Sequence, residues 1–292
     1  MRAHPAEYEM VSPPSLQAAL HLLATEPDQW TPIAGGTEIM VQFSAGRLNT
    51  HRLINLWNIP ELRQITETDE KLTIGGGCTF ADLRAQAAVG RNFPLLSQAA
   101  SWLGGIANQN RATVAGNIVN ASPAADSPPA LLAYEAELEL ISSTGTRLIA
   151  YPAFHVGYKK TVLATGELVL SIHLAKRFDR WFSYTRKTGA RNAQAISKIC
   201  IAALGRLRAG FIEAVHIGMG AVAPTPLRLS QTERLLTGQP ITNELIASAR
   251  RVIVNEIKPI DDIRSSVEYR QQVAANLLED FLRRFAASER TL

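Results

Sequence analysis

The sequence predicts an α+β protein composed of two sub-domains and a smaller C-terminal domain. Short strands alternate with capped amphipathic helices in the first part of the chain. Strand patterns followed by two helical patterns occupy the last part, and polarity rises between the two parts near 175–179. A chain of 292 residues is long enough for two domains. We place the divisions at 1–58, 59–176 and 177–292.

The first sub-domain shows a small β-α-β pattern. Ser15 is a suitable N-cap for a helix whose leucines share one face. The strand that follows this helix ends in the pair Gly35 and Gly36. The expected elements are a helix after Ser15, a strand over 30–34, a helix over 37–43 and a strand over 52–56.

The remaining parts continue the mixture of helices and strands. Thr79 is a suitable N-cap, and Pro128 is acceptable in the first turn of a helix. Between them, 112–126 is expected to be an irregular loop. The expected strands are 71–75, 137–141, 147–150, 167–174, 181–187, 197–208 and 211–218, and the expected helices lie at 79–83, 93–108, from 127, 243–257 and 265–286.

Composition and charge exclude several classes of function. The net charge of +4 arises from scattered basic residues, the densest group being Arg186, Lys187 and Arg191, so nucleic-acid binding is not favoured. Cys78 and Cys200 stand far apart in sequence without neighbouring His ligands, which argues against a metal site, an iron–sulfur cluster or a disulfide scaffold. No apolar run approaches the roughly 20 residues of a membrane span, and no signal peptide is evident. We therefore expect a cytoplasmic protein.

Two short glycine-centred segments, 33–38 and 112–126, carry the strongest functional signal. Small residues leave the main chain bare in both, and hydroxyl or amide side chains stand beside it. Exposed peptide N–H groups in such segments bind anions, typically phosphate, without lysine. Two such segments about eighty residues apart suggest a ligand with two phosphates, as in a dinucleotide.

Each segment also has a purely structural interpretation. Glycine pairs at strand ends are common turns, and the spacing around Gly35 matches neither the Rossmann fingerprint nor a P-loop. In the second segment Asn117 and Asn120 could cap turns, and Asp126 could cap the helix that begins near Pro128. The dinucleotide hypothesis therefore depends on both segments acting together.

Several ordered motifs give the chain a clear family resemblance. The motifs are Pro32-Ile33-Ala34-Gly35-Gly36-Thr37-Glu38, Thr113-Val114-Ala115-Gly116-Asn117-Ile118, Ala121-Ser122-Pro123-Ala124-Ala125-Asp126, and the segments 218–228 and 265–270. Together they resemble the FAD-binding medium subunit of molybdenum hydroxylases, the xanthine dehydrogenase and carbon monoxide dehydrogenase family. The resemblance spans essentially the whole chain. It implies a two-sub-domain FAD-binding domain of the PCMH/VAO-like type, followed by the α+β C-terminal domain of a flavoprotein subunit.

The resemblance also implies roles for individual residues. The first segment would cradle the FAD pyrophosphate from one sub-domain, and Thr113, Gly116 and Asn117 would hold it from the other. Asp126 would bind ribitol or adenosine hydroxyls, and either Arg186 or Lys187 would approach the flavin. Trp102 and Leu103 would lie near the isoalloxazine ring, with core packing as the alternative. The implied cofactor-binding residues are Ile33, Ala34, Gly35, Gly36, Thr37, Glu38, Leu103, Thr113, Ala115, Gly116, Asn117, Asn120, Asp126, Leu168, Arg186 and Lys187.

The chain departs from the family pattern at few positions. The family usually has Gly-Gly-Asn where this chain has Ala115-Gly116-Asn117, which an alanine with ordinary dihedral angles tolerates. Some members carry a cysteine-rich insertion for a [4Fe–4S] cluster, which Cys78 and Cys200 cannot supply. Neither segment contains a His or Cys for covalent attachment, so we expect non-covalent FAD.

The first functional hypothesis is an oxidoreductase subunit that transfers electrons. Through the resemblance, a large partner subunit would hold the molybdenum cofactor, and a small one would hold [2Fe-2S] clusters in a dimer of heterotrimers. Electrons would pass from those clusters through FAD to NAD, oxygen or another acceptor, without catalytic acid–base residues in this chain. The alternatives are a self-contained flavin-dependent oxidase or reductase of a small organic substrate, and a nucleotide-binding regulatory protein.

Overall fold

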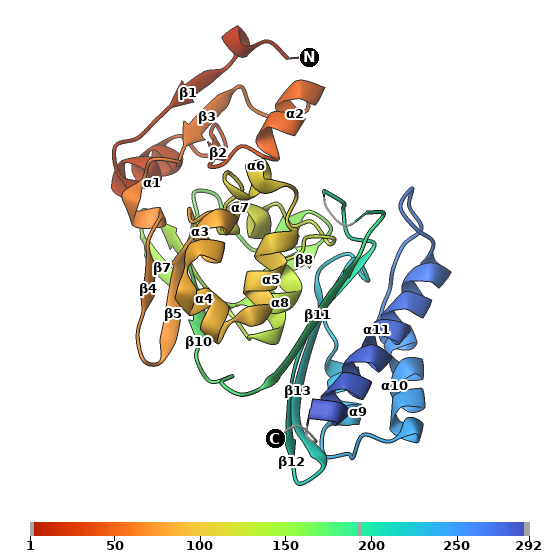
Figure 1. Ribbon diagram of the computed structural model, residues 1–292. Coiled ribbons are helices and arrows are strands. Elements are labelled where there is room, and N and C mark those ends of the chain that lie inside the picture. Colours follow the sequence, from red (N-terminus) through yellow and green to blue (C-terminus); the bar gives the residue numbers. More distant parts are fainter. Residues whose placement is uncertain (1–2, 192–193, 289–292) are drawn as a thin grey trace.

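The computed structural model describes residues 3–191 and 194–288, so the outer ends of the predicted divisions lie outside it. The described chain forms three lobes, arranged along the sequence from the N-terminal lobe through a central lobe to a C-terminal layer (Figure 1). Each lobe contains both strands and helices, which confirms the α+β class. Within these ranges, none of the helices combines the length and the apolar composition that a bilayer crossing requires.

The N-terminal lobe is a three-stranded parallel sheet with two helices. Its strand order is β1-β3-β2, and the expected β-α-β unit is formed by β2 and β3. The Ser15 hydroxyl accepts a hydrogen bond from the Ala18 N–H at 3.2 Å, as its N-cap position predicts. The elements are β1 (Glu9–Val11), α1 (Leu16–Thr25), β2 (Thr31–Ile33), α2 (Ile39–Ala45) and β3 (Arg52–Asn55).

The central lobe is a five-stranded antiparallel sheet, ordered β4-β5-β10-β6-β7, with helices on one side (Figure 1). Thr79 and Asp82 form a capping box at the start of α3. The strands are β4 (Ile65–Glu67), β5 (Lys71–Gly75), β6 (Glu137–Ser142), β7 (Gly145–Ala150), β8 (His155–Gly157), β9 (Lys160–Thr161) and β10 (Leu168–Ala175). The helices are α3 (Phe80–Ala85), α4 (Ala87–Asn92), α5 (Pro94–Trp102), α6 (Ile106–Gln109), α7 (Val114–Val119) and α8 (Pro128–Ala133).

The expected loop over 112–126 contains a helix, α7. Its first turn is held by the Thr113 hydroxyl, which accepts a hydrogen bond from the Gly116 N–H at 3.2 Å. Contacts with the neighbouring 76–78 segment add to this local cap, because the Val114 N–H donates to the Cys78 carbonyl at 2.9 Å. Tertiary contacts thus stabilise a helix in a sequence whose Gly and Asn residues have low helix propensity.

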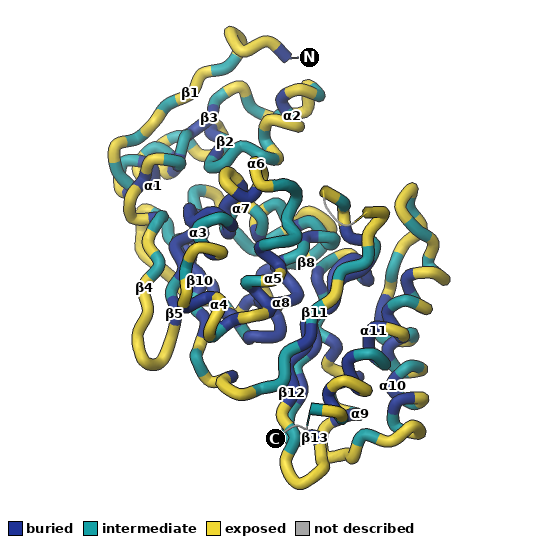
Figure 2. The backbone as a smooth tube through the Cα atoms, in the orientation of Figure 1, coloured by how far each residue is buried: buried dark blue, intermediate teal, exposed yellow. Residues whose placement is uncertain are grey.

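The C-terminal layer is an antiparallel sheet covered on both faces. Its elements are β11 (Phe182–Thr188), β12 (Ile199–Arg208), β13 (Phe211–Gly220), β14 (Leu227–Arg228), α9 (Ser230–Leu236), α10 (Asn243–Glu256) and α11 (Val267–Ser288). Alternate residues of β12 enter different hydrophobic clusters: Ala202 and Leu204 pack with the central lobe, whereas Ala203 packs with the C-terminal helices. The long strands therefore lie between α8 and the α9–α11 layer, and they are buried along most of their length (Figures 1 and 2).

Candidate functional site

The first glycine-centred segment presents a row of free main-chain donors. It joins the end of β2 at Ile33 to the start of α2 at Ile39. Within the described chain, the N–H groups of the five residues from Gly35 to Ile39 donate no hydrogen bond. Gly36 has φ +78°, in the left-handed region that glycine adopts without strain. Consecutive free N–H groups at such a turn form an anion-binding concavity.

The two glycine-centred segments meet at Gly35. The Arg111 Nε–H donates to the Gly35 carbonyl at 3.3 Å. A Cβ atom on Gly35 would lie 1.6 Å from the Arg111 carbonyl oxygen, so only glycine permits this approach. The Arg111 guanidinium also lies over the Trp57 ring, 3.9 Å from its centroid. The two glycine-centred segments are therefore neighbours in space.

The second segment differs from the expected bare loop, because its main-chain donors are already bonded. The Ala115 N–H donates to the Gly76 carbonyl at 3.0 Å, and the Gly116 N–H is capped by Thr113. Its free groups are side chains instead. The Asn117 Oδ1 accepts a hydrogen bond from the Ser127 hydroxyl at 2.7 Å, and among residues 3–191 and 194–288 the Asn117 amide nitrogen donates to no partner. The two segments therefore differ in the donors that they present: the first presents peptide N–H groups, and the second presents the side-chain amide of Asn117.

Asp126 and Lys187 form a buried ion pair between the central lobe and the C-terminal layer. The Lys187 Nζ donates to Asp126 Oδ2 at 2.6 Å, and the Ser197 hydroxyl donates to Oδ1 at 2.5 Å. The two charged side chains are only 11% and 9% exposed. Burial raises the pKa of the Asp126 carboxyl, while the ammonium and hydroxyl donors oppose that rise. Asp126 therefore fixes the Lys187 side chain and does not cap the helix after Ser127.

The alternation of β11 places Arg186 and Lys187 on opposite faces of the strand. Lys187 also donates to the Trp102 carbonyl at 3.1 Å, so it faces the central lobe and the Asp126 segment. Arg186 is exposed and acts electrostatically on Tyr184 and Asp280, which face each other between β11 and α11. Of the two, Lys187 is therefore the residue that contacts another predicted site residue, Asp126.

The two predicted apolar site residues differ in location. Leu103 ends α5 and is partly buried against the central hydrophobic cluster, next to the Trp102 carbonyl that Lys187 contacts. Leu168 begins β10 and is buried in the cluster that joins the N-terminal lobe to the central one. Leu103 therefore adjoins the Lys187 contact, whereas Leu168 has a packing role in the structure.

Three further residues of the site were not identified from sequence. Arg111 contacts the first segment directly, Ser197 completes the Asp126 network, and the Lys159 Nζ lies 2.6 Å from Asn120 Oδ1. Each comes from a segment distant in sequence from its partner. The adjacency of Arg111 to the second motif was the one available signal.

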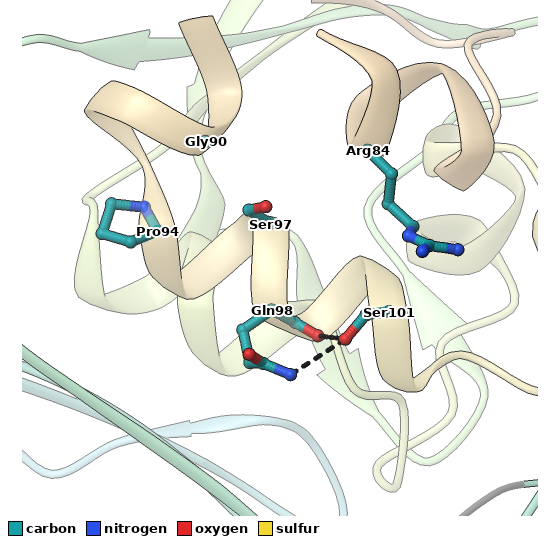
Figure 3. A pocket seen from close by; sticks show the side chains of 6 residues that line it. All are labelled: Arg84, Gly90, Pro94, Ser97, Gln98 and Ser101. Atoms are coloured by element: carbon teal, nitrogen blue, oxygen red, sulfur yellow. Dashed lines mark hydrogen bonds between the residues drawn. The ribbon is translucent and has the colours of Figure 1, made fainter. Parts of the chain in front are cut away.

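A separate surface cleft of about 330 Å³ does not contribute to this site. It lies beside α4 and α5 and is lined by Arg84, Gly90, Pro94, Ser97, Gln98 and Ser101 (Figure 3). The Ser101 hydroxyl donates to the Gln98 carbonyl at 2.7 Å and accepts from Gln98 Nε2 at 2.9 Å. None of the lining residues belongs to the glycine-centred segments, and in the described chain no group of three His, Cys, Asp or Glu side chains could hold a metal ion.

Two protein-family models match the chain, one over the N-terminal and central lobes and the other over the C-terminal layer. Residues 6–176 match the FAD binding domain in molybdopterin dehydrogenase, and residues 184–285 match the CO dehydrogenase flavoprotein C-terminal domain. The fold and site thus define an FAD-binding oxidoreductase subunit, as the sequence resemblance indicated. The chain belongs to the flavoprotein family of the molybdopterin dehydrogenases.

Individual relatives agree with this assignment. The chain is 31% identical over 258 residues to the xanthine dehydrogenase FAD-binding subunit of Escherichia coli O157:H7, covering 88% of each chain. It is 26% identical to the glyceraldehyde dehydrogenase medium chain of Sulfolobus acidocaldarius, covering 92% of this chain and 95% of that one. Among solved structures, a chain of carbon monoxide dehydrogenase from Hydrogenophaga pseudoflava superimposes with a TM-score of 0.90 at 26% identity, covering 94% and 95% of the two chains.

Proposed function

We propose that this chain carries FAD at the junction of its three lobes and passes electrons within a molybdenum hydroxylase complex. The observation that carries the proposal is the row of free N–H groups after Gly35, held directly against the second motif by Arg111. When bound, FAD supplies the redox chemistry, and the protein supplies its position and surroundings. A non-covalent attachment agrees with the absence of His and Cys from both motifs.

The proposed roles of the residues follow from what each one offers. The N–H groups after Gly35 and the Asn117 amide would donate hydrogen bonds to the diphosphate. Lys187, fixed by Asp126 and the Trp102 carbonyl, would place a positive charge near the flavin ring. This arrangement agrees with a cofactor-binding part at 1–58 and 59–176, completed by one strand of 177–292. In this proposal, Lys187 is the residue that the C-terminal domain contributes to the FAD site.

The proposed assembly and electron path extend beyond this chain. Relatives are named as medium chains or FAD-binding subunits, which supports partnership with a large molybdenum-cofactor subunit and a small [2Fe-2S] subunit. We propose a dimer of such heterotrimers in the cytoplasm, with electrons leaving for NAD, oxygen or another acceptor. The relatives are named for different substrates: xanthine, glyceraldehyde and carbon monoxide. The large molybdenum-cofactor subunit would therefore determine the substrate in our proposal.

A purification experiment tests the proposal. The chain is expressed with its proposed partner subunits and isolated as a complex, and its flavin is released by heat or acid and identified by chromatography. We expect one FAD per chain, fully released without proteolysis, and reduction of the bound flavin when the complex meets its donor. A complex that neither contains nor takes up FAD contradicts the proposal. Steady-state turnover by the isolated chain with an organic donor would support the self-contained oxidase instead.

A further inference from the structure

The proposed diphosphate site has an unbalanced charge within its own motifs. The two segments 33–38 and 112–126 contain Glu38 and Asp126 and no lysine or arginine, and Asp126 is already paired with Lys187. A diphosphate adds two negative charges, and free N–H groups supply only partial positive charges. Charge-assisted hydrogen bonds to phosphate normally come from Lys or Arg. A cation from another segment would remove this imbalance.

Lys159 places such a cation between the two segments. Its Nζ lies 3.7 Å from Glu38 Oε1 in the first segment and donates to Asn120 Oδ1 in the second segment at 2.6 Å. The Lys159 side chain is 38% exposed, so its ammonium remains open to a ligand. No other lysine in the described chain contacts both motifs.

The segment that carries Lys159 is fixed in place. Lys159 lies in the turn between β8 and β9 with φ +55°, a region that side chains other than Gly, Asn and Asp seldom adopt. The ring nitrogen Nε2 of His155 is 2.9 Å from the Ile118 carbonyl oxygen of α7, and the Val162 N–H donates to the Phe154 carbonyl at 3.0 Å. The hairpin is thus anchored on the helix of the second motif, with a lysine held at a strained turn position.

We propose that Lys159 is a cofactor-binding residue whose ammonium neutralises the diphosphate. This inference rests on the proposed function. Without a bound phosphate the ammonium pairs with Glu38 and Asn120, and with the ligand present it turns toward the added charge. Arg111 does not take this role, because its guanidinium is stacked on Trp57 and bonded to Gly35.

The experiment compares two neighbouring lysines. Lys159→Met removes the charge but keeps the side-chain length, and Lys160→Met removes the same charge from an exposed position whose Nζ has no polar partner in the described chain. Each full-length variant is purified in its complex and stripped of flavin, and is then titrated with FAD, ADP and adenosine by calorimetry. ADP contains the diphosphate and adenosine does not, so the pair isolates the phosphate contribution.

We expect Lys159→Met to weaken FAD and ADP binding about tenfold and to leave adenosine binding unchanged, whereas Lys160→Met leaves all three unchanged. Lys159→Arg should retain most of the affinity. Equal losses for ADP and adenosine, or unchanged binding in Lys159→Met, would overturn the inference. A wild-type complex that binds neither FAD nor ADP would instead overturn the proposed function itself.

Discussion

Gly35→Ala is the most direct test of the contact between the two motifs. A methyl group at this position would lie 1.6 Å from the Arg111 carbonyl oxygen, 2.4 Å from its carbonyl carbon and 3.2 Å from the Ala112 nitrogen. Ordinary contacts begin at 3.4 Å, so the two main chains must separate by about 1.8 Å. All three obstructing atoms belong to the main chain, so a side-chain rotation cannot relieve the clash.

The energetic cost follows from this geometry. Overpacking in well-packed regions costs about 1–3 kcal/mol, and a clash between two main chains belongs at the upper end, about 3 kcal/mol. The separation would also break the Arg111–Gly35 hydrogen bond and move the free N–H groups after Gly35 away from the second segment. We therefore expect Gly35→Ala to lower both the free energy of unfolding and the FAD content.

The assay is urea unfolding followed by circular dichroism, with the flavin content of each purified variant measured in parallel. Gly90→Ala in α4 is the matched control, because a Cβ there meets nothing within 4 Å and alanine favours a helix. We expect that control to match or slightly exceed the wild type. If Gly35→Ala retains full FAD and unfolds within about 0.5 kcal/mol of the wild type, the motifs do not meet as described.

Three further predictions concern charge, protonation and thiol reactivity. Lys187→Met leaves the Asp126 carboxylate buried without its cation, so it should lower the free energy of unfolding in urea by about 3–5 kcal/mol and FAD affinity about tenfold. Arg186→Met, on the exposed face, should change neither quantity. Burial lowers the pKa of His155, so the contribution of neutral His155 to stability is present above pH 6.5 and is lost as the pH falls. Between pH 7.5 and 5.5, the free energy of unfolding should therefore change less in His155→Gln than in the wild type. An equal change in the two proteins would contradict this. Burial raises the pKa of Cys78 to about 11 and also raises that of Cys200, so iodoacetamide at pH 8 should label both thiols only in urea, as read by mass spectrometry.

Local signals in the sequence were sufficient to locate most helices and the longer strands. Ser15 and Thr79 are caps at the positions that their sequence contexts predict. The strand β1 was missed, because it has three mostly exposed residues and is defined by pairing with β3, forty-three residues away. The helix α7 was missed for a similar reason, because its first turn depends on carbonyl groups of the 76–78 segment. Long-range pairing is the information that local patterns lack.

The site shows the same division between local and long-range information. The glycine-centred motifs can be recognised locally, because each is a continuous run rich in small residues. The alternation of β11 separates Arg186 from Lys187, but which face meets the central lobe depends on sheet packing. Lys159 was not predicted, because its partners lie 39 and 121 residues away in sequence and its turn resembles any exposed basic hairpin.

The proposed FAD site draws residues from three lobes, and this has a consequence for stability. The first motif belongs to the N-terminal lobe, Asn117 to the central lobe and Lys187 to the C-terminal layer. A ligand that touches all three binds only when they are assembled, so its binding free energy adds to the stability of that assembly. The direct polar links between lobes include Arg111 to Gly35 and Lys159 to Glu38 at the N-terminal lobe, and Lys187 to Asp126 and Arg228 to Glu135 at the C-terminal layer. Loss of FAD should therefore loosen the N-terminal lobe first, because Lys187 and the shared sheet packing hold the other two parts together without it.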